Sequence, residues 1–592
     1  MSSTRNRSKK SQKESTPTPS ARSMASIFRG DNEEEIIEKI KQIEKPSTPE
    51  EQPVKQAING DDSDDIANSP FPFNYIYQAQ DFLNDNLNFL KAVQIFVVGF
   101  FIQLLYLQRD KFIKLDKNYL SVGFNWIGLS VALILSHIRA KGELQLPDFN
   151  HVYSILLPLL LNILHYSPDW FMINISLNYF IIDRLNPLFN LVSGVMFYEM
   201  YNDPTRKFTT MQFGQVAVLH FFLSTILNYI NDGCIEEEEM PTIKQDELVT
   251  DSDYNKSLKK SEIQLICLLL TNLLFNQELM DDILPLAIFQ KLYISFMAPA
   301  FVLYPIYTYI PGLINLALFG GMFYGLTVYQ LNTTLEENAV TWLYEYIMND
   351  PQKLQLVQIW AIVSGITIPT VFYFADKMSL NIRRKVWHLF IIVMLTYTPI
   401  ILFEEIEFTM ITLLGTLIVF LIIELLRFTQ MTFIGKYLFN KLLKFQDFKD
   451  LKGPLNVSYI YLLAGVTFPI VYDYMLHHEQ VSIVRYMGII SLGVGDTCAS
   501  IIGRKWGTFK WKGSDTSLQG SAAFVVSTLI AIYVVDYVFT GREEYIPIQN
   551  WENVLVSVLT NGILEGVASI NDNLLIPILL PASFGILNQC YP

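Results

Sequence analysis

Long apolar segments are the feature that most constrains what this chain can fold into. From residue 86 to the C-terminus, apolar residues come in blocks of about 20 with almost no charge, the length that crosses a bilayer as a helix. Hydrophobic residues make up 51% of the 592 residues, and charged residues only 17%. We therefore expect an all-α, polytopic integral membrane helical bundle. Strand-length segments of alternating hydrophobicity are missing, which argues against an outer-membrane barrel.

About fifteen segments are predicted to cross the membrane as helices, because every backbone polar group in lipid must be satisfied within its own segment. The stretch 170–201 is apolar but interrupted by Pro187 and by charges, so the count stays open there. The predicted spans are 86–107, 118–138, 150–166, 208–230, 263–275, 287–309, 312–331, 354–375, 386–403, 408–428, 455–476, 483–503, 520–539, 552–569 and 573–588.

Composition divides the chain into three regions. Residues 1–75 are rich in Ser, Thr, Pro and charge, which predicts a disordered cytosolic tail. Within it, the helical spacing of isoleucines at 31–45 indicates a short amphipathic helix. The alternative is a transient helix that has no partner. Residues 76–350 form an N-terminal transmembrane region of unknown role, and 354–592 hold the unusual polar residues. The acidic loop 231–262 is predicted to be a solvated linker. The polar N-terminus predicts that the first span acts as the insertion signal.

Charge and cysteine content exclude several classes of partner. The formal net charge is −14, which argues against a nucleic-acid partner. The four cysteines have no close spacing, so neither a disulfide framework nor a zinc site is expected.

Basic residues predict the orientation of the C-terminal spans. Lys and Arg are concentrated in loops 376–385, 427–452 and 504–519, whereas the intervening loops 404–406 and 477–482 contain none. This alternation follows the positive-inside rule and places the three basic loops in the cytosol. Counting onward through the remaining spans places the segment just before residue 573 on the same side.

The densest chemical signal is the segment 491–520. Asp496 falls inside an apolar span, where a carboxylate costs about 2.5–3.5 kcal/mol and normally faces a polar cavity. Glycines and cations surround it, a combination that suits a nucleotide phosphate and its metal ion. The alternative is a set of helix-packing glycines beside ordinary cytosolic charge. These residues are Gly493, Gly495, Gly503, Gly507 and Gly513, with Arg504, Lys505, Lys510 and Lys512.

A second cluster lies at 561–577. Glu565 falls within a predicted span, and Asp572 and Asn573 lie at its cytosolic end. Carboxylates and an amide oxygen near phosphates are typical ligands of Mg²⁺, which prefers oxygen. The alternative is a helix cap formed by Asp572 and Asn573.

Two further pairs lie at cytosolic ends of spans. Lys385 and His388 are three residues apart and therefore on one helix face, where they are candidate phosphate contacts. Glu424 and Arg427 have the same spacing, and a structural ion pair is as plausible for them as a functional role.

Together these segments resemble the polyprenol kinase family, which includes dolichol kinases, phytol kinases and the fungal CTP-dependent diacylglycerol kinase. The length and the many N-terminal spans favour the dolichol kinase branch. The resemblance covers about 385–577, less than half of the chain. The matching residues, in order, are Arg384, Lys385 and His388; Glu424 and Arg427; Asp496, Thr497, Ala499 and Ser500; Gly503, Gly507, Trp511, Gly513, Ser514 and Gly520; Glu565, Gly566, Ala568 and Ser569; and Asp572, Asn573 and Pro577.

The resemblance implies an endoplasmic reticulum enzyme, with its site facing the cytosol, that transfers the γ-phosphate of CTP to dolichol. The product, dolichyl phosphate, is the lipid carrier for protein glycosylation (N-glycosylation, O-mannosylation and GPI anchors). Residues 354–592 would then be the CTP-dependent lipid kinase core. The resemblance further implies Asp496, Glu565 and Asp572 as catalytic residues, with Asp496 as the base. Mg²⁺, or another divalent cation, would bind Asp496, Asp572 and Asn573. The implied CTP contacts are Thr497, Ser500, Gly503, Arg504, Lys505, Gly507, Lys510, Lys512, Gly513, Ser514, Gly520, Lys385 and His388.

The chain departs from the family pattern after Trp511. Thr516 and Gln519 stand where the family usually has Lys and Glu, so a point-charge phosphate ligand is missing, and Lys510 or Lys512 is the expected substitute. A CTP-dependent diacylglycerol kinase or another polyprenol kinase remains the alternative enzyme. A membrane transporter or scaffold is the alternative from another class.

Overall fold

The computed structural model describes most of the chain after residue 88. The described residues are 89–109, 131, 149–164, 167–181, 187–199, 208–231, 257–378, 380–446, 454–511, 516–568 and 570–591. The predicted tail 1–75 with its helix 31–45, nearly all of the span 118–138 and most of the acidic loop 231–262 lie outside these residues.

The described part of the chain is almost entirely helical. Its helices before residue 350 are α5 (Phe89–Leu107), α8 (Phe149–Leu164), α9 (Pro168–Leu177), η1 (Asn178–Ile181), α10 (Pro187–Glu199), α11 (Thr210–Asn231), α12 (Lys260–Phe275), α13 (Gln277–Asp282), α14 (Leu284–Leu303), η4 (Tyr304–Ile306), α15 (Gly312–Leu335) and α16 (Ala339–Met348).

The helices after residue 350 include one π-helical segment, η8. They are α17 (Pro351–Phe374), η5 (Ala375–Lys377), α18 (Leu380–Thr396), η6 (Pro399–Ile401), α19 (Ile406–Thr429), α20 (Phe433–Leu442), η7 (Leu443–Phe445), α22 (Ser458–His477), α23 (Val484–Gly488), η8 (Ile489–Gly495), α24 (Asp496–Trp506), α25 (Leu518–Phe539), α26 (Trp551–Val567) and α27 (Asp572–Cys590). Two short strands, β1 (Val481–Ser482) and β2 (Tyr545–Ile546), form a parallel pair.

Ten helices within the described residues are long and apolar enough to cross a membrane, which confirms the predicted fold class of a polytopic helical membrane protein. Four other predicted spans also form helices, namely α8, α12, α18 and α26. Each has 16 or 17 residues, slightly shorter than the roughly 20 that a straight span needs. The expected break at Pro187 coincides with the start of α10.

Side chains at the helix ends explain several boundaries. Asp350 caps α17 by accepting hydrogen bonds from the backbone N–H groups of Gln352 and Lys353, and Pro351 supplies the first helical residue. Ser517 caps α25 in the same way through the N–H of Gly520. These caps satisfy backbone donors that would otherwise lack partners where the helices begin.

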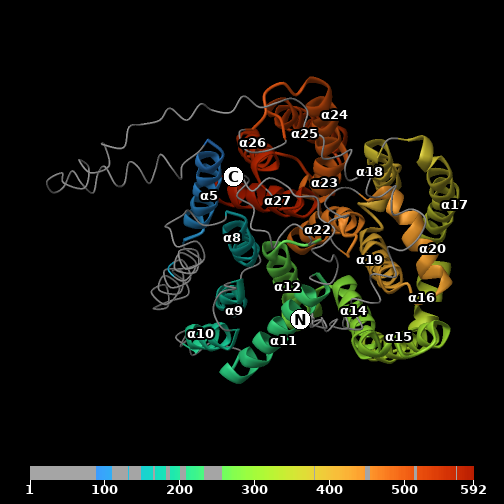
Figure 1. The fold of residues 1–592 in the computed structure, drawn as a ribbon. Helices are drawn as coiled ribbons and strands as arrows, with labels where there is room; N and C mark the ends of the chain where they lie inside the picture. The colour runs from blue at the N-terminus through green and yellow to red at the C-terminus, as the bar shows by residue number, and fades with distance from the viewer. Residues whose placement is uncertain are drawn as a thin grey trace, which may run out of the picture.

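The C-terminal helices lie at the centre of the bundle. Figure 1 shows α22–α27 between α5 and α8 on one side and α18–α20 on the other. One hydrophobic core contains residues of α5, α8, α12, α19, α22, α25, α26 and α27, among them Phe101 of α5, Leu265 of α12 and Leu579 of α27. The N-terminal transmembrane region therefore shares a core with the segment that holds the predicted site.

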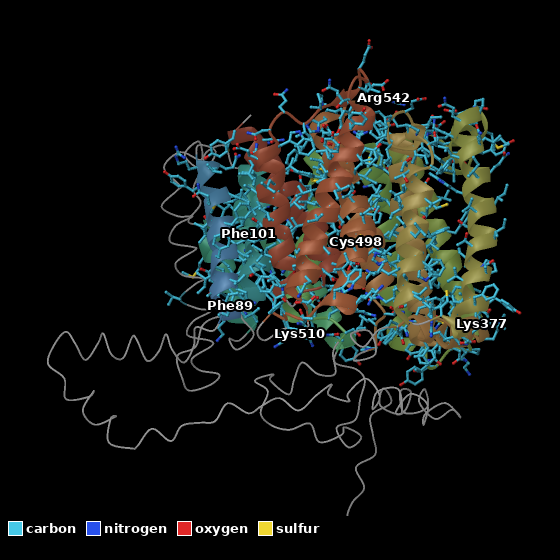
Figure 2. All side chains as sticks on the ribbon, turned by 90° about the horizontal axis from the view of Figure 1, so that it is seen from above. Phe89, Phe101, Lys377, Cys498, Lys510 and Arg542 are labelled. Atoms are coloured by element: carbon cyan, nitrogen blue, oxygen red, sulfur yellow. The ribbon has the colours of Figure 1, made fainter. Side chains whose placement is uncertain are left out.

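The loops lie at two opposite ends of the bundle, as their charges predicted. Figure 2 shows Lys377 and Lys510 at one edge, which we call the basic end, and Arg542 at the opposite edge. At the Arg542 end, Lys353 Nζ lies 3.6 Å from Glu405 Oε2, and Val481 pairs with Tyr545. Glu405 and Val481, which come from the two loops that lack Lys and Arg, therefore lie at the end of the bundle opposite the basic end.

Candidate active site

Asp496 and Lys385 form an ion pair between two helices. Asp496 begins α24 directly after the π-helical segment η8, and Lys385 lies in α18. Lys385 Nζ is 2.5 Å from Asp496 Oδ2 and 3.3 Å from the Asp496 carbonyl oxygen. A π-helical turn often occurs at functional sites, since its wider turn changes the direction of the side chains that follow. The carboxylate that the sequence marked as unusual thus has a charged partner.

His388 joins the same cluster from the next turn of α18. Its Nδ1 is 2.9 Å from the Leu492 carbonyl oxygen of η8 and 3.6 Å from Asp496 Oδ2. Because a π-helix leaves carbonyl groups without the usual α-helical partners, the imidazole N–H satisfies one of them. The prediction that Lys385 and His388 share one helix face is confirmed, since both contact the segment around Asp496.

Glu565 is held by a serine that sequence reasoning missed. Ser521 Oγ of α25 donates a hydrogen bond to Glu565 Oε2 at 3.1 Å and accepts one from Trp511 Nε1 at 3.0 Å. Trp511 stacks in turn on Phe89 of α5, with 5.9 Å between the ring centroids. A serine hydroxyl has a single proton, and the tryptophan donor directs that proton toward the carboxylate.

Asp572 and Asn573 lie at the start of α27. Asn571 caps this helix by accepting a hydrogen bond from Asn573 N at 3.1 Å, and Asp572 Oδ1 accepts another from the same N–H at 3.0 Å. The cap predicted as the alternative role is therefore present, with Asn571 as the cap residue. Asn573 Oδ1 is buried and has no hydrogen-bond partner among the described residues. It is an oxygen ligand that the fold leaves open.

The four sequence clusters converge on one region. Electrostatic interactions link Glu565 to Asp572, Asp496 and Lys385, although these residues come from α26, α27, α24 and α18. Arg504, about two turns beyond Asp496 on α24, interacts with the Asp496 carboxylate. We call Lys385, His388, Asp496, Glu565 and Asp572 the Asp496 cluster.

The glycines of α24 and α25 are accounted for by helix packing. A Cβ atom on Gly503 would lie 3.4 Å from Gly520 Cα and 3.0 Å from Ser517 Oγ. One on Gly507, directly after α24, would lie 2.5 Å from Oγ of Ser517, the cap residue of α25. The alternative of helix-packing glycines is therefore realised at these three positions, and their contact with a nucleotide stays a prediction.

The remaining predicted nucleotide contacts lie on α24 and the loop that follows. Arg504, Lys505 and Lys510 are exposed, with Lys510 at the basic end (Figure 2), and Ser500 is half-buried. Thr497 Oγ1 is buried and has no partner within the part of the chain that the structure describes. The other three predicted contacts, Lys512, Gly513 and Ser514, lie outside the described residues.

The two residues that depart from the family pattern both support this loop. Thr516 Oγ1 donates to the Gly566 carbonyl oxygen at 2.6 Å. Gln519 accepts from Phe509 N at 3.1 Å and donates to Thr508 Oγ1 at 2.7 Å. Thr516 is thereby held against α26, and Gln519 is tied to Thr508 and Phe509, so their role in the structure is positional.

Glu424 and Arg427 form a buried ion pair that anchors the start of α22. Arg427 Nη2 lies 2.6 Å from Glu424 Oε1 and donates to the Pro454 carbonyl oxygen at 2.5 Å. Glu424 also accepts from Asn456 N at 2.7 Å and from the Tyr459 hydroxyl at 2.9 Å. These contacts give the pair the structural role that was one of its two predicted readings.

A second buried ion pair, at the Arg542 end, was missed from the sequence. Asp473 and Arg485 are fully buried, with Arg485 Nε 2.7 Å from Asp473 Oδ2. Arg485 also donates to the carbonyl oxygens of Leu402, His478 and Gln480. The available signal was an arginine inside an apolar span with an aspartate in the preceding span, which usually implies pairing within the protein.

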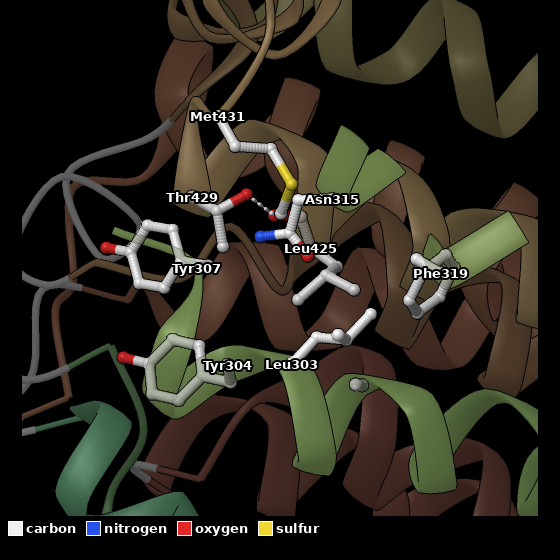
Figure 3. Close-up of a pocket in the computed structure, with 9 residues that line it drawn as sticks. Leu303, Tyr304, Tyr307, Asn315, Phe319, Leu425, Thr429 and Met431 are labelled. Atoms are coloured by element: carbon white, nitrogen blue, oxygen red, sulfur yellow. Dashed lines mark hydrogen bonds between the residues drawn. The ribbon is translucent and has the colours of Figure 1, made fainter. Parts of the chain in front are cut away.

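A small pocket lies away from the Asp496 cluster. Figure 3 shows it between α14, α15 and α19, with Tyr304, Tyr307 and Asn315 among its lining residues. The Asn315 amide is fully buried, and neither of its polar atoms has a partner among the described residues. None of the predicted site residues lines this pocket.

Comparisons with known proteins identify one relative that is similar over most of the chain and others that are similar over part of it. A family model described as the dolichol kinase N-terminal domain matches residues 38–234. A dolichol kinase of Saccharomyces cerevisiae is 28% identical over 507 residues, which cover 83% of this chain and 88% of the yeast protein. No solved structure matches the chain.

Dolichol kinases of two other organisms are similar to part of the chain. A dolichol kinase of Schizosaccharomyces pombe is 29% identical over 40% of this chain and 49% of its own length. The human dolichol kinase is 27% identical over 43% of this chain and 49% of its own length. The N-terminal match falls in the region whose role the sequence left open, and it agrees with the branch that the length and the spans favoured. The comparisons therefore support the resemblance to dolichol kinases that the motifs and the many spans indicate.

Proposed function

We propose that this protein transfers the γ-phosphoryl group of CTP to the terminal hydroxyl of dolichol. The observation that carries the proposal is the convergence of Lys385, Asp496 and Glu565 from separate helices. The relatives named dolichol kinase supply the acceptor. The ordered motifs that resemble CTP-dependent polyprenol kinases supply the donor.

In the proposed reaction, the dolichol oxygen forms a bond to the γ-phosphorus while the bond between that phosphorus and the β–γ bridging oxygen breaks. CDP leaves, and the hydroxyl proton passes to Asp496. Such transfers depend mainly on positioning and on charge neutralisation. Lys385 keeps the Asp496 carboxylate in place, and the exposed Arg504, Lys505 and Lys510 are suited to the triphosphate.

A magnesium ion fits the residues present. Mg²⁺ usually binds one or two protein carboxylates together with substrate phosphates, so it does not require a cage of protein ligands. The described residues contain no group of three or more His, Cys, Asp or Glu side chains placed to hold a metal ion, so substrate phosphates would have to supply further ligands. Asp572, the open Asn573 Oδ1 and Asp496 would hold the ion. When bound, it would neutralise phosphate charge.

We further propose that the protein resides in the endoplasmic reticulum membrane with its basic end in the cytosol. The positive-inside pattern supports this orientation. CTP would then reach the Asp496 cluster from the cytosol, and the long isoprenoid would approach laterally from the bilayer. The product would serve protein glycosylation.

Radiolabel transfer from γ-labelled CTP tests the proposal in membranes that express the chain. We expect labelled dolichyl phosphate with CTP and much less with ATP. Equal use of ATP would overturn the donor, and labelling of diacylglycerol alone would favour the alternative enzyme. Thermal stabilisation of the detergent-solubilised protein by CTP is also expected, and its absence together with absent transfer would favour a transporter or scaffold.

A further inference from the structure

The connection between α26 and α27 is held at both ends by the N-terminal transmembrane region. Gln94 Nε2 of α5 donates to the Val567 carbonyl oxygen at 3.0 Å, across 473 residues of sequence. Glu262 Oε1 of α12 accepts from Asn571 N at 2.8 Å, across 309 residues. Helix α5 also packs against α26 and α27 (Figure 1). The helices that precede the kinase core therefore contact the loop that leads into Asp572.

Glu262 is a buried carboxylate with both oxygens in use. It lies in the first turn of α12 with only 5% of its surface exposed. Oε2 accepts from Lys259 N at 3.0 Å, which completes the cap of α12, while Oε1 leaves the helix and reaches Asn571. A buried carboxylate is costly unless hydrogen bonds compensate, and a helix N-terminus favours its charge. Capping alone needs one oxygen, so the second bond has a separate role.

Asn571 transmits this constraint to the start of α27. Its side chain accepts from Asn573 N, and its carbonyl oxygen accepts from Leu575 N at 3.0 Å. On the other side of the helix, a Cβ atom on Gly465 would lie 2.3 Å from the Asn573 carbonyl oxygen, so α22 leaves no space for α27 to shift toward it. The position of Asp572 is thus set between α22 and Glu262.

We propose that Glu262 is a positioning residue of the phosphotransfer site, acting through Asn571 on Asp572 and Asn573. The N-terminal transmembrane region is then an integral part of the active site. This inference rests on the proposed function for the role of Asp572. A displacement of about 1 Å in a reacting group can lower a rate by about 10²-fold, so the loss of one distant hydrogen bond is sufficient to reduce turnover.

The test compares Glu262→Ala and Glu262→Gln with Gln264→Ala in the full-length protein. Gln264 is a matched control, since it is buried in the same helix but bonds His220 and the Leu177 carbonyl oxygen, both in the N-terminal region. We expect kcat to fall at least tenfold in Glu262→Ala with the KM for dolichol within twofold. Glu262→Gln should be intermediate, because its amide retains one acceptor oxygen. Gln264→Ala should lower the melting temperature without lowering kcat per folded molecule.

Hydrogen–deuterium exchange of the peptide around residues 568–575 supplies a readout that needs no activity. Exchange should be faster in Glu262→Ala than in the wild-type protein and unchanged in Gln264→Ala. The positioning role would be overturned if hydrogen–deuterium exchange were unchanged in Glu262→Ala. It would also be overturned if the kcat of Glu262→Ala equalled that of Gln264→Ala. A wild-type protein that phosphorylates no dolichol would overturn the proposed function instead, and the exchange experiment would still decide whether Glu262 holds this connection.

Discussion

Lys385 Nζ lies 2.5 Å from Asp496 Oδ2, and the two residues are 111 positions apart in the sequence. Each lies on a helix packed against the π-helical segment that precedes Asp496, and both side chains are largely shielded from solvent. An ion pair in such a setting fixes the direction of the carboxylate. The residue singled out as the base is thereby oriented before any substrate arrives.

Asp496→Asn should abolish turnover while the protein stays folded and inserted. Asparagine keeps the size of the side chain but loses its negative charge and its basicity. Activity should be measured with γ-labelled CTP and dolichol, and folding by the melting temperature in detergent. If more than about a tenth of the activity remained, the charge would supply less than roughly 1.4 kcal/mol of transition-state stabilisation, and Asp496 would be structural.

Lys385→Met should lower kcat by about tenfold to a hundredfold, since a hydrogen bond to a charged group contributes about 1.5–3 kcal/mol. Lys385→Arg keeps the charge but replaces a compact ammonium by a planar fork, so it should restore only part of the rate. Lys377→Met, a change to an exposed lysine at the same end, is the control and should retain full activity. Equal rates for all three variants would contradict a role for the ion pair.

Ser521→Ala should reduce turnover because it removes the hydrogen-bond donor to Glu565 and leaves Trp511 Nε1 without its acceptor. We expect a loss of about threefold to thirtyfold, the range for one hydrogen bond of intermediate strength. Ser527→Ala on the same helix is the matched control, because the Ser527 hydroxyl bonds only a carbonyl oxygen of its own helix among the interactions described. Identical rates for the two variants would show that Glu565 does not depend on Ser521.

The sequence predicted that Asp496 and Lys385 lie at the same end of the bundle. It did not predict the hydrogen bonds that Ser521 makes with Glu565 and Trp511. An aspartate in an apolar span and a lysine at a cytosolic helix start are visible locally, and topology placed both at one end of the bundle. Ser521 and Trp511 look like ordinary members of an apolar helix and a loop. Their roles depend on contacts with Glu565 and Phe89, which lie far away in sequence and leave no periodic signal.

The two buried ion pairs also differ in how far they could be predicted from the sequence. The spacing of Glu424 and Arg427 places them on one helix face, so their pairing was predicted from sequence. Asp473 and Arg485 come from different helices joined by a loop, and no spacing rule connects them. The glycines were ambiguous for a different reason, since a close helix contact and a phosphate cradle require the same absence of a side chain.

Arg485→Ala should strongly lower the melting temperature. The change leaves the buried Asp473 carboxylate without its partner and three carbonyl oxygens without a donor, a loss of about 3–5 kcal/mol for a buried pair. The double variant Asp473→Ala/Arg485→Ala should recover part of the loss, since no unpaired charge remains. Arg542→Ala, an exposed residue at the same end, should shift the melting temperature much less. A similar shift for Arg485→Ala and Arg542→Ala would refute this account.

The orientation of the bundle can be tested with single cysteines at its two ends. Lys510 and Glu543 are both exposed, and Figure 2 shows Lys510 at the edge opposite Arg542, the neighbour of Glu543. In sealed microsomes, a membrane-impermeant maleimide should label Lys510→Cys directly and Glu543→Cys only after permeabilisation. The background should be a chain whose four native cysteines are replaced by alanine.

A natural glycosylation sequon provides an independent check on the same orientation. Asn456 precedes Val457 and Ser458, and it should carry no glycan because it lies near the basic end, is buried, and has its backbone N–H bonded to Glu424. Burial alone would block modification at Asn456, so an engineered sequon in the exposed turn around Lys510 is the decisive comparison. A glycan at that turn, or labelling of Glu543→Cys in intact microsomes, would place the Asp496 cluster away from cytosolic CTP and would require a different phosphate donor.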